Sequence, residues 1–392
     1  MKQTVVLAYS GGLDTSVCIR WLTEHGWRVV AFCADVGQGE DFGPVEKRAR
    51  LCGAEKVIIR DLRAPFVRDY VLPALKAGAV YEGQYLLATA LSRPLIARAL
   101  AETARQEGAA AVAHGCTGKG NDQVRIEVSL KILNPKLKIL APVREWELKS
   151  RTEEYRYAQK RNLPVPKKES RYSIDQNLWG VSIESGPLED PWLEPPREAY
   201  RWTRDPAHSK SRADTLQIDF QKGIPVGQNG RRVPILDLIQ RLNHLGAQHG
   251  VGRTDLIEDR LIGIKSREVY EAPAATILHA AHRELEQLTL DRETLSFKQE
   301  VSLRYARMIY DGLWFTPLKS ALDAFVETTQ ESVTGSVRVK LFKGQCVIVG
   351  RRSPYSRYAR TLATYEGRDL FDQKAASGFI TLWGLPYVRQ KR

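Results

Sequence analysis

The first 160 residues alternate short apolar runs with segments in which apolar residues recur at helical spacing. Strand-length runs occupy residues 4–9, 28–33, 56–60 and 110–114, and helical periodicity occupies residues 14–25 and 94–107. Pro94 stands where the second helix is expected to start, and Gly108 lies just past its end. Strands that alternate with helices at this rhythm predict a parallel sheet with crossover helices, hence an α/β domain over residues 1–165.

The rhythm changes at residues 162–170, a Pro- and Lys-rich stretch that predicts a linker. Beyond it the pattern predicts a loop at 187–196, a hairpin with an Asn-Gly turn at 224–234, a helix at 235–245 and two strands around a Lys-Gly turn at 335–350. Helices and hairpins without a strand–helix–strand rhythm indicate a mixed α+β domain, which we place at residues 171–365.

The amino-acid composition excludes several classes of protein but does not identify the binding partner. Of the 392 residues, 43% are hydrophobic and 27% are charged, which is ordinary globular usage and argues against disorder, collagen and coiled coil. The net charge of +13 and the pI near 9.5 suit a nucleic-acid partner, and equally an enzyme that gathers anionic small molecules. Charge alone therefore decides nothing.

The cellular location is predicted from the absence of membrane-spanning and signal segments in the sequence. No apolar run approaches membrane-spanning length, and the N-terminal apolar run ends in glycines too early for a signal peptide. The five cysteines are widely spaced without a CxxC pair, which is typical of reduced thiols and of neither a zinc site nor a redox pair. We expect a cytoplasmic protein without a membrane partner.

A glycine loop, SGGLDTS at residues 10–16, follows the first strand and opens the first helix. Two glycines let backbone N–H groups approach a phosphate, and a helix N-terminus adds unpaired donors and the positive end of its dipole. The structural alternative is a tight turn in which Asp14 caps the helix. The loop is not a Walker A motif, and the glycines at 37, 39 and 43 have the wrong spacing for a dinucleotide fingerprint.

A second glycine-rich segment, HGCTGKGNDQVR at residues 114–125, follows the fourth strand. Its hydroxyl, carboxamide, carboxylate and two cations could hold a zwitterionic amino acid, with Asp122 facing the ammonium group and Lys119 or Arg125 facing phosphate. Capping of the next helix by Asn121 or Asp122 is the structural interpretation, and the two are compatible.

The SGGLDTS loop resembles the pyrophosphate loop of the PP-loop ATP pyrophosphatase superfamily. Together with the second segment, and with the blocks at 81–97, 172–182, 188–196 and 249–271 and DQKAASGFI near the C-terminus, it makes the chain similar to the argininosuccinate synthase family. The resemblance implies a Rossmann-like PP-loop nucleotide-binding domain, a mixed α+β synthetase domain and a C-terminal oligomerisation arm at 366–392. It also implies a homotetramer.

The resemblance implies an AMP-forming ligase of arginine biosynthesis. Such an enzyme joins citrulline and aspartate through a citrullyl-adenylate, with ATP as co-substrate and Mg²⁺ riding on the phosphates. The ATP residues carried over are Ala8, Tyr9, Ser10, Gly11, Gly12, Leu13, Asp14, Thr15, Ser16, Ala34 and Gly115. Those for citrulline are Tyr85, Asn121, Arg125, Ser173, Ser182, Glu258 and Tyr270, and those for aspartate are Thr117, Asn121 and Asp122. We assign no general base and no protein ligand to a metal.

Several positions depart from the family's usual residues. Ala90 replaces a serine near citrulline, Cys116 replaces an alanine beside the nucleotide, and Asp259 replaces an asparagine. Glu268 stands where a glycine is familiar, and would be strained if that position needs a positive φ. These changes bear on citrulline binding and leave the ATP loop intact.

Two other functions remain open from the sequence. A PP-loop enzyme that modifies tRNA would explain the basic charge, although no cysteine pair serves sulfur transfer and no dense basic run is present. A nucleotide-binding relative that has lost citrulline through the departures is the non-enzymatic alternative. The ligase is the function we expect, with small-molecule substrates and no nucleic-acid partner.

Overall fold

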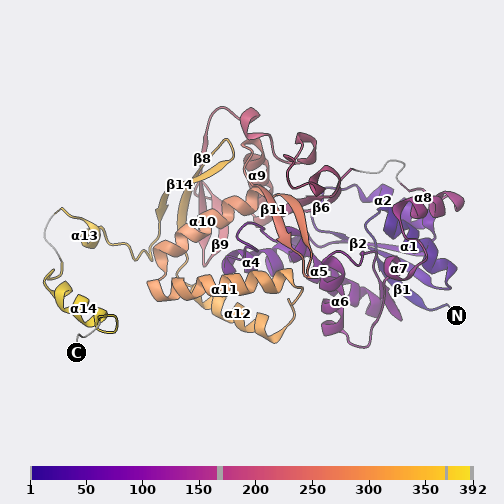
Figure 1. Cartoon of the computed structure of the whole chain (residues 1–392), viewed down its shortest axis with the longest axis horizontal. Coiled ribbons are helices and arrows are strands. Elements are labelled where there is room, and N and C mark those ends of the chain that lie inside the picture. The colour runs from indigo at the N-terminus through magenta and orange to yellow at the C-terminus, as the bar shows by residue number, and fades with distance from the viewer. Residues whose placement is uncertain (1, 166–170, 367–369, 389–392) are drawn as a thin grey trace.

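The computed structural model describes residues 2–165, 171–366 and 370–388, so part of the linker predicted at 162–170 lies outside the described residues. The first half contains a five-stranded sheet of order β3-β2-β1-β4-β5 (Figure 1), in which every pairing is parallel. Its strands are β1 (Thr4–Ala8), β2 (Arg28–Asp35), β3 (Lys56–Asp61), β4 (Ala111–Ala113) and β5 (Lys138–Leu140). The four predicted strands are confirmed, and the three-residue β5 was too short to be recognised from the sequence.

Helices cover both faces of this sheet, as the burial of successive β1 residues requires. Val5 and Leu7 face a cluster with α1, while Val6 faces a second cluster with α5. The helices of this half are α1 (Leu13–Glu24), α2 (Phe42–Cys52), α3 (Arg63–Phe66), α4 (Leu72–Ala77), α5 (Ala88–Gln106), α6 (Asp122–Leu133), α7 (Pro142–Glu145) and α8 (Arg151–Lys160), with a π-helical turn at Val67–Val71. Strands β2 and β3 extend the sheet to one side of β1, and β4 and β5 extend it to the other. The strand order therefore reverses between β1 and β4, and the loops after these two strands are neighbours.

The predicted start of a helix at Pro94 is wrong, because α5 begins at Ala88 and contains Pro94 in its interior. Proline removes one backbone hydrogen bond from a helix. The turn before it is nevertheless held, since Ala88, Ala90 and Leu91 are buried and α5 contacts β6 and β7 of the second half. Tertiary packing therefore extends the helix beyond its local signal.

The second half contains two antiparallel sheets, of orders β10-β9-β8-β13-β14 and β11-β12-β7-β6. The strands are β6 (Ser173–Asn177), β7 (Gly180–Glu184), β8 (Asp214–Gln221), β9 (Ile224–Gln228), β10 (Arg231–Arg232), β11 (Arg253–Asp259), β12 (Lys265–Glu271), β13 (Gly335–Phe342) and β14 (Gln345–Arg352). The helices are α9 (Ile235–Gln248), α10 (Pro273–Thr289), α11 (Arg292–Tyr310), α12 (Pro317–Thr329), α13 (Arg360–Ala363) and α14 (Ala375–Gly384). Short 3₁₀ turns lie at Gly186–Glu189, Arg197–Ala199 and Pro206–His208. The expected mixed α+β fold is confirmed.

Both predicted hairpins form on the turns that the sequence indicated. Asn229 and Gly230 have φ values of 54° and 75°, and Lys343 and Gly344 have values of 43° and 83°. Two consecutive residues with positive φ make the type I′ turn, whose twist matches that of the flanking strands. The boundaries predicted at residues 165 and 365 stay predictions.

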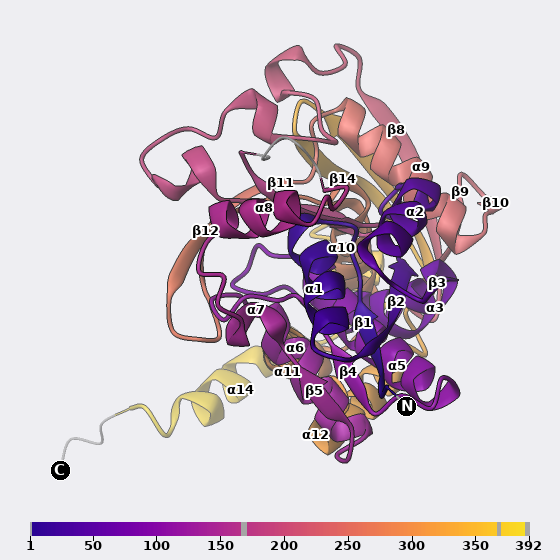
Figure 2. The same cartoon turned by 90° about the vertical axis from the view of Figure 1, so that its right-hand side faces the viewer.

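The C-terminal segment stands away from the rest of the molecule. Helices α13 and α14 project beyond β14 (Figure 1), and α14 also stands clear in the view turned by 90° (Figure 2). Phe379, Ile380, Leu382 and Trp383 of α14 are 64–69% exposed. Helix α14 therefore leaves large apolar side chains exposed to solvent in the single chain.

Candidate active site

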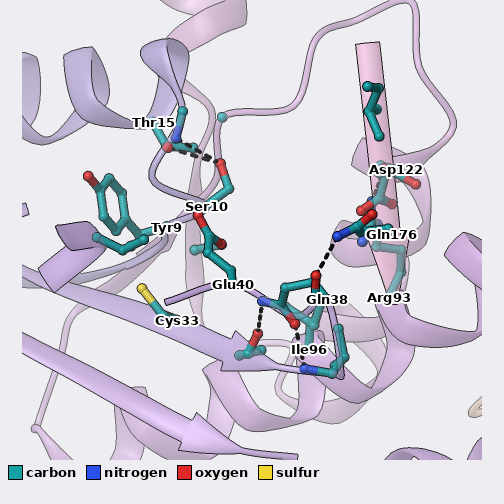
Figure 3. Close-up of a pocket in the computed structure, with 18 of the residues that line it drawn as sticks. Tyr9, Ser10, Thr15, Cys33, Gln38, Glu40, Arg93, Ile96, Asp122 and Gln176 are labelled. Atoms are coloured by element: carbon teal, nitrogen blue, oxygen red, sulfur yellow. Dashed lines mark hydrogen bonds and ion pairs between the residues drawn. The ribbon is translucent and has the colours of Figure 1, made fainter. Parts of the chain in front are cut away.

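A cavity of about 950 Å³ opens at the carboxyl ends of β1, β2 and β4, which is the edge where open α/β sheets bind ligands. Figure 3 shows Tyr9, Ser10 and Thr15 on one side of this cavity and Arg93, Asp122 and Gln176 on the other. The predicted ATP residues that line it are Ala8, Tyr9, Ser10, Gly12, Thr15, Ala34 and Gly115. The two predicted glycine segments thus meet at one cavity.

The loop after β1 presents a helix N-terminus without a side-chain cap. Gly12 is the N-cap of α1, and Asp14 lies in the first turn and does not cap it, contrary to the structural interpretation of the sequence. Gly11 has a φ of 77°, and a Cβ built there would lie 3.2 Å from Val45 Cγ1. The guanidinium of Arg48 donates a hydrogen bond to the carbonyl of Gly11. The loop is therefore held in a conformation that glycine favours, with backbone donors available for an anion.

The hydroxyls of this loop divide into two groups. Ser10 Oγ and Thr15 Oγ1 lie 3.2 Å apart beside the cavity. Ser16 is fully buried, and its Oγ lies 3.2 Å from the hydroxyl of Tyr9. Burial raises the pKa of Tyr9 to about 12, so this hydroxyl keeps its proton. Ser10 and Thr15 are thus placed to meet a ligand, whereas Ser16 supports the loop from beneath.

Opposite the loop, Asp122 is held between two arginines. Arg93 Nη2 lies 2.7 Å from Asp122 Oδ2, and Arg125 Nη1 lies 3.1 Å from Asp122 Oδ1. Arg93 also bonds Asp175 of β6. Burial alone would raise the pKa of Asp122, but the two guanidiniums lower it to about 2. A permanently ionised carboxylate therefore faces the cavity, suited to an ammonium group.

The four-stranded sheet has one polar face, and Asp175 on it shares Arg93 with Asp122. Successive side chains of a strand alternate between faces. Ser182 of β7 pairs in register with Asp175 of β6 and with Tyr270 of β12, and Ser173 pairs with Glu184. The face is made by Ser173, Asp175, Ser182, Glu184, Glu258, Glu268 and Tyr270. Four predicted citrulline residues, one from each of the four strands, thus share it.

Aromatic contacts join this face to the first half of the chain. The rings of Tyr85 and Tyr270 are stacked with centroids 4.1 Å apart, and the hydroxyl of Tyr270 donates to Glu258 Oε2 at 2.5 Å. A residue that the sequence did not nominate, Tyr310, donates to Glu258 Oε1 at 2.7 Å. Asn121 Nδ2 donates to the hydroxyl of Tyr310 at 2.8 Å. Most of the predicted citrulline residues thus form one connected cluster.

Two predicted residues lie at the edge of this cluster. Thr117 is exposed in the loop after β4, and Ser173 is the first residue of β6. Ser173 shares a sheet face with Ser182 but sits two residues along β6 from the position paired with it. The structure therefore brings these two near the site without drawing them into its hydrogen bonds.

The expectation that Asn121 or Asp122 caps α6 is wrong. Asn121 is the N-cap, but its side chain makes no cap hydrogen bond. Its Oδ1 accepts a hydrogen bond from the backbone N–H of Leu261 at 2.9 Å, and its Nδ2 donates one to the hydroxyl of Tyr310. The carboxylate of Asp122 is bound by the arginines. Contacts across the two halves have taken the place of local capping.

Three residues that differ from the family pattern, Glu268, Ala90 and Cys116, fit the structure without backbone strain. Glu268 lies in β12 with an extended backbone, so the strain expected from a positive φ does not arise. Its carboxylate lies 2.8 Å from Arg260 Nη2. Ala90 is fully buried, and its N–H donates to the hydroxyl of Tyr85 at 3.3 Å. Cys116 lines the cavity, and burial raises its pKa to about 12, which keeps the thiol protonated.

Arg93, Asp175 and Tyr310 were missed by the sequence interpretation. Arg93 lies in the block at 81–97 that carries part of the family resemblance, but no role was assigned to it from the sequence. Tyr310 ends an amphipathic helix in which a tyrosine is usually core. Among the described residues, no group of three or more His, Cys, Asp or Glu side chains is arranged to hold a metal ion. Within the same residues, no helix is long and apolar enough to cross a membrane.

Two family models match the chain. The Arginosuccinate synthase N-terminal HUP domain matches residues 4–164, and the Arginosuccinate synthase C-terminal domain matches residues 172–389. The chain is 56% identical over 388 residues to a protein named argininosuccinate synthase from Carboxydothermus hydrogenoformans, covering 98% of this chain and 97% of that one. It is 55% identical over 386 residues to the protein of that name from Rubrobacter xylanophilus (98% and 94% covered). It is 56% identical over 383 residues to that from Geobacillus kaustophilus (97% and 94% covered).

Proposed function

The chain belongs to the argininosuccinate synthase family, and on that premise we propose that it joins citrulline to aspartate at the expense of ATP, releasing AMP and pyrophosphate. The observation that carries this function is the approach of two kinds of site to one cavity. An uncapped helix N-terminus and an ionised carboxylate both line the cavity, and Arg125 joins that carboxylate to a cluster of amino-acid-binding groups. The first suits a polyphosphate, and the second suits zwitterionic amino acids.

The chemistry needs both sites together. A ureido carbon is stabilised by resonance, and its oxygen leaves poorly. Transfer of AMP to that oxygen releases pyrophosphate and makes a good leaving group, which the amine of aspartate then displaces. Because the activated intermediate forms on citrulline, the protein contributes mainly position and charge stabilisation.

We assign ATP to the loop of residues 8–16 together with Ala34 and Gly115. Support comes from the cavity lining, which includes seven of these eleven residues, and from the start of α1, whose N-cap residue makes no side-chain cap hydrogen bond. The pyrophosphate portion would lie against Gly12, Ser10 and Thr15. Mg²⁺ would enter on the phosphate oxygens and water rather than in a protein cage, which agrees with its preference for keeping several waters. When bound, it would neutralise charge on the departing pyrophosphate.

We assign citrulline to the connected cluster and to the residue at its edge, namely Tyr85, Asn121, Arg125, Ser182, Glu258 and Tyr270 together with Ser173. Arg125 is 4% exposed, and its Nη2 makes no hydrogen bond with any described residue. A buried donor without a partner is costly, and a ligand carboxylate would satisfy it. Glu258 lies in the same cluster, and its carboxylate can form an ion pair with the ammonium group of citrulline.

We assign aspartate to Thr117, Asn121 and Asp122. Asp122 supplies the charge for the ammonium group, and its low pKa keeps it ionised at every pH at which the protein is expected to work. Arg93 touches both Asp122 and Asp175 and holds the first of these carboxylates toward the cavity. The sequence and the geometry both leave the general base unassigned.

The tRNA-modifying alternative is not favoured. Both family models and relatives more than half identical over nearly the whole chain carry the synthase name. The non-enzymatic alternative depended on the departures at Ala90, Asp259 and Glu268, and the residues of the citrulline cluster still contact one another despite them.

Adenylation of the ureido oxygen is tested with isotope-labelled citrulline. Citrulline carrying ¹⁸O in its ureido group, incubated with aspartate, ATP and the protein, is expected to pass the label into AMP, because that oxygen leaves with the nucleotide. Mass spectrometry of AMP provides the measurement. Argininosuccinate formed together with unlabelled AMP would contradict the mechanism, and the absence of argininosuccinate would contradict the function.

We further propose that the chain forms a homotetramer in the cytoplasm. The five cysteines are all free thiols, which suits a reducing compartment. The exposed apolar side chains of α14 suit burial against another subunit. We therefore expect residues 366–392 to act as an oligomerisation arm.

Deletion of residues 366–392 is expected to lower the oligomeric state, because it removes the apolar side chains that another copy would cover. Light scattering should give four times the 44.2 kDa of one chain for the full protein and a smaller multiple after deletion. Trp192→Ala is the control, since this side chain is 92% exposed but lies outside the arm. An unchanged multiple after deletion would show that other surfaces hold the assembly.

A further inference from the structure

Tyr310 is the last residue of α11 and lies where the two halves of the chain meet. It is 1% exposed. Its hydroxyl donates to Glu258 Oε1 of β11 at 2.7 Å and accepts from Asn121 Nδ2, at the start of α6, at 2.8 Å. One hydroxyl group therefore connects two residues assigned to substrate, one from each half of the chain.

The backbone and ring of Tyr310 contact a third such residue. Arg125 Nε donates to the carbonyl of Tyr310 at 2.8 Å, and its guanidinium lies 4.7 Å from the centre of the ring. The ring also stacks on Tyr81 with centroids 3.7 Å apart and planes 5° from parallel. Cation–π contact and stacking both fix the orientation of the ring.

The turn after α11 is shaped for this approach. Gly312 has a φ of 76°, and a Cβ built there would lie 2.7 Å from the Cα of Arg125. Only glycine combines that backbone conformation with so close an approach. The chain therefore brings the end of α11 directly against α6, and Tyr310 with it.

We propose that Tyr310 is a positioning residue for citrulline, which holds the Glu258 carboxylate and the Arg125 guanidinium in the relative positions that the substrate's ammonium and carboxylate groups require. This inference rests on the proposed function. The carboxylate of Glu258 receives one tyrosine hydroxyl on each oxygen, Tyr310 on Oε1 and Tyr270 on Oε2. Two donors at opposite oxygens prevent the carboxylate from rotating.

The same contacts set the ionisation of Glu258. Burial raises its pKa, and the hydroxyls of Tyr270 and Tyr310 lower it in part. The other titratable and charged groups around it are Arg125, Arg260, Glu268, Tyr81, Tyr85 and Tyr270. Removing the hydroxyl of Tyr310 therefore raises the pKa of Glu258 further, so that a larger fraction is neutral at a given pH and fewer molecules can pair with an ammonium group.

Tyr310→Phe tests the inference because it removes the hydroxyl and keeps the ring. We expect the KM for citrulline to rise about tenfold, as for loss of a hydrogen bond to a charged group. The KM for ATP should change less than about twofold, since the loop after β1 is untouched. The acid limb of kcat/KM for citrulline should move to higher pH by about 0.5–1 unit.

Tyr305→Phe is the matched control. Tyr305 lies on the same helix, is fully buried, and donates its hydroxyl to Asp323 Oδ1 at 2.6 Å, away from the cluster. It should lower the Tm in the manner of any lost buried hydrogen bond and leave the acid limb in place. A Tyr310→Phe protein that changes all three KM values equally, or whose acid limb does not move, would overturn the inference. An inactive wild-type protein would overturn the function itself, and the inference with it.

Discussion

Replacing Asp122 by asparagine is expected to lower kcat/KM for aspartate by about 10²–10³-fold while changing the KM for ATP less than about threefold. Asparagine keeps the shape of the side chain and removes its charge, so the ammonium group of aspartate loses its counter-ion in a buried setting. Arg93 keeps Asp175 as a partner, which limits the damage to the fold. Steady-state kinetics with each substrate varied in turn provides the measurement.

Glu24→Gln is the control for Asp122→Asn. Glu24 is likewise held by an arginine, with Arg161 Nε at 2.7 Å, and the bonds from Arg161 lower its pKa. It lies at the far end of α1 from the cavity. Kinetics close to those of the wild type are expected for this control. Equal losses toward ATP and aspartate in Asp122→Asn would show that the carboxylate supports the whole site and has no particular role toward aspartate.

Gly11→Ala is expected to reduce kcat by about 10²–10³-fold, the range seen when one preorganised donor to developing charge is lost. An alanine here is strained by the φ of 77°, and its Cβ would press on Val45 at 3.2 Å. The loop must shift to relieve both, and its backbone N–H groups then no longer point to where the pyrophosphate departs. Pyrophosphate should also become a weaker product inhibitor, which initial-rate measurements with added pyrophosphate would detect.

Gly26→Ala separates this effect from backbone strain in general. Gly26 has a φ of 85° at the other end of the same helix, and a Cβ there meets nothing within 4 Å. Both variants therefore carry the cost of a positive φ, about 1 kcal/mol, but only one disturbs the loop. A Gly26→Ala protein as inactive as Gly11→Ala would mean that loss of stability, and not loop geometry, explains the result.

The parallel sheet could be predicted from the sequence because its strands are short, apolar on both faces and separated by helices with clear ends. The hairpin turns could be predicted because Asn229-Gly230 and Lys343-Gly344 carry their own backbone preference. The start of α5 could not, since packing against β6 and β7 overrode Pro94. A local sequence preference therefore predicts the structure correctly where no tertiary contact favours a different conformation.

The class of fold, a loop predicted to bind an anion after the first strand and a list of residues that resemble a family's ligands all follow from the amino-acid sequence. The contacts among those residues do not follow from it and are visible in the folded chain. Folding places Asp122 between Arg93 and Arg125, brings Asp175 of a second sheet to the cavity, and sets Tyr310 between Asn121 and Glu258. The reason is physical: a glycine turn or an apolar run acts over a few neighbouring residues, whereas a buried hydroxyl takes whichever partners the packing of distant segments brings within hydrogen-bonding distance.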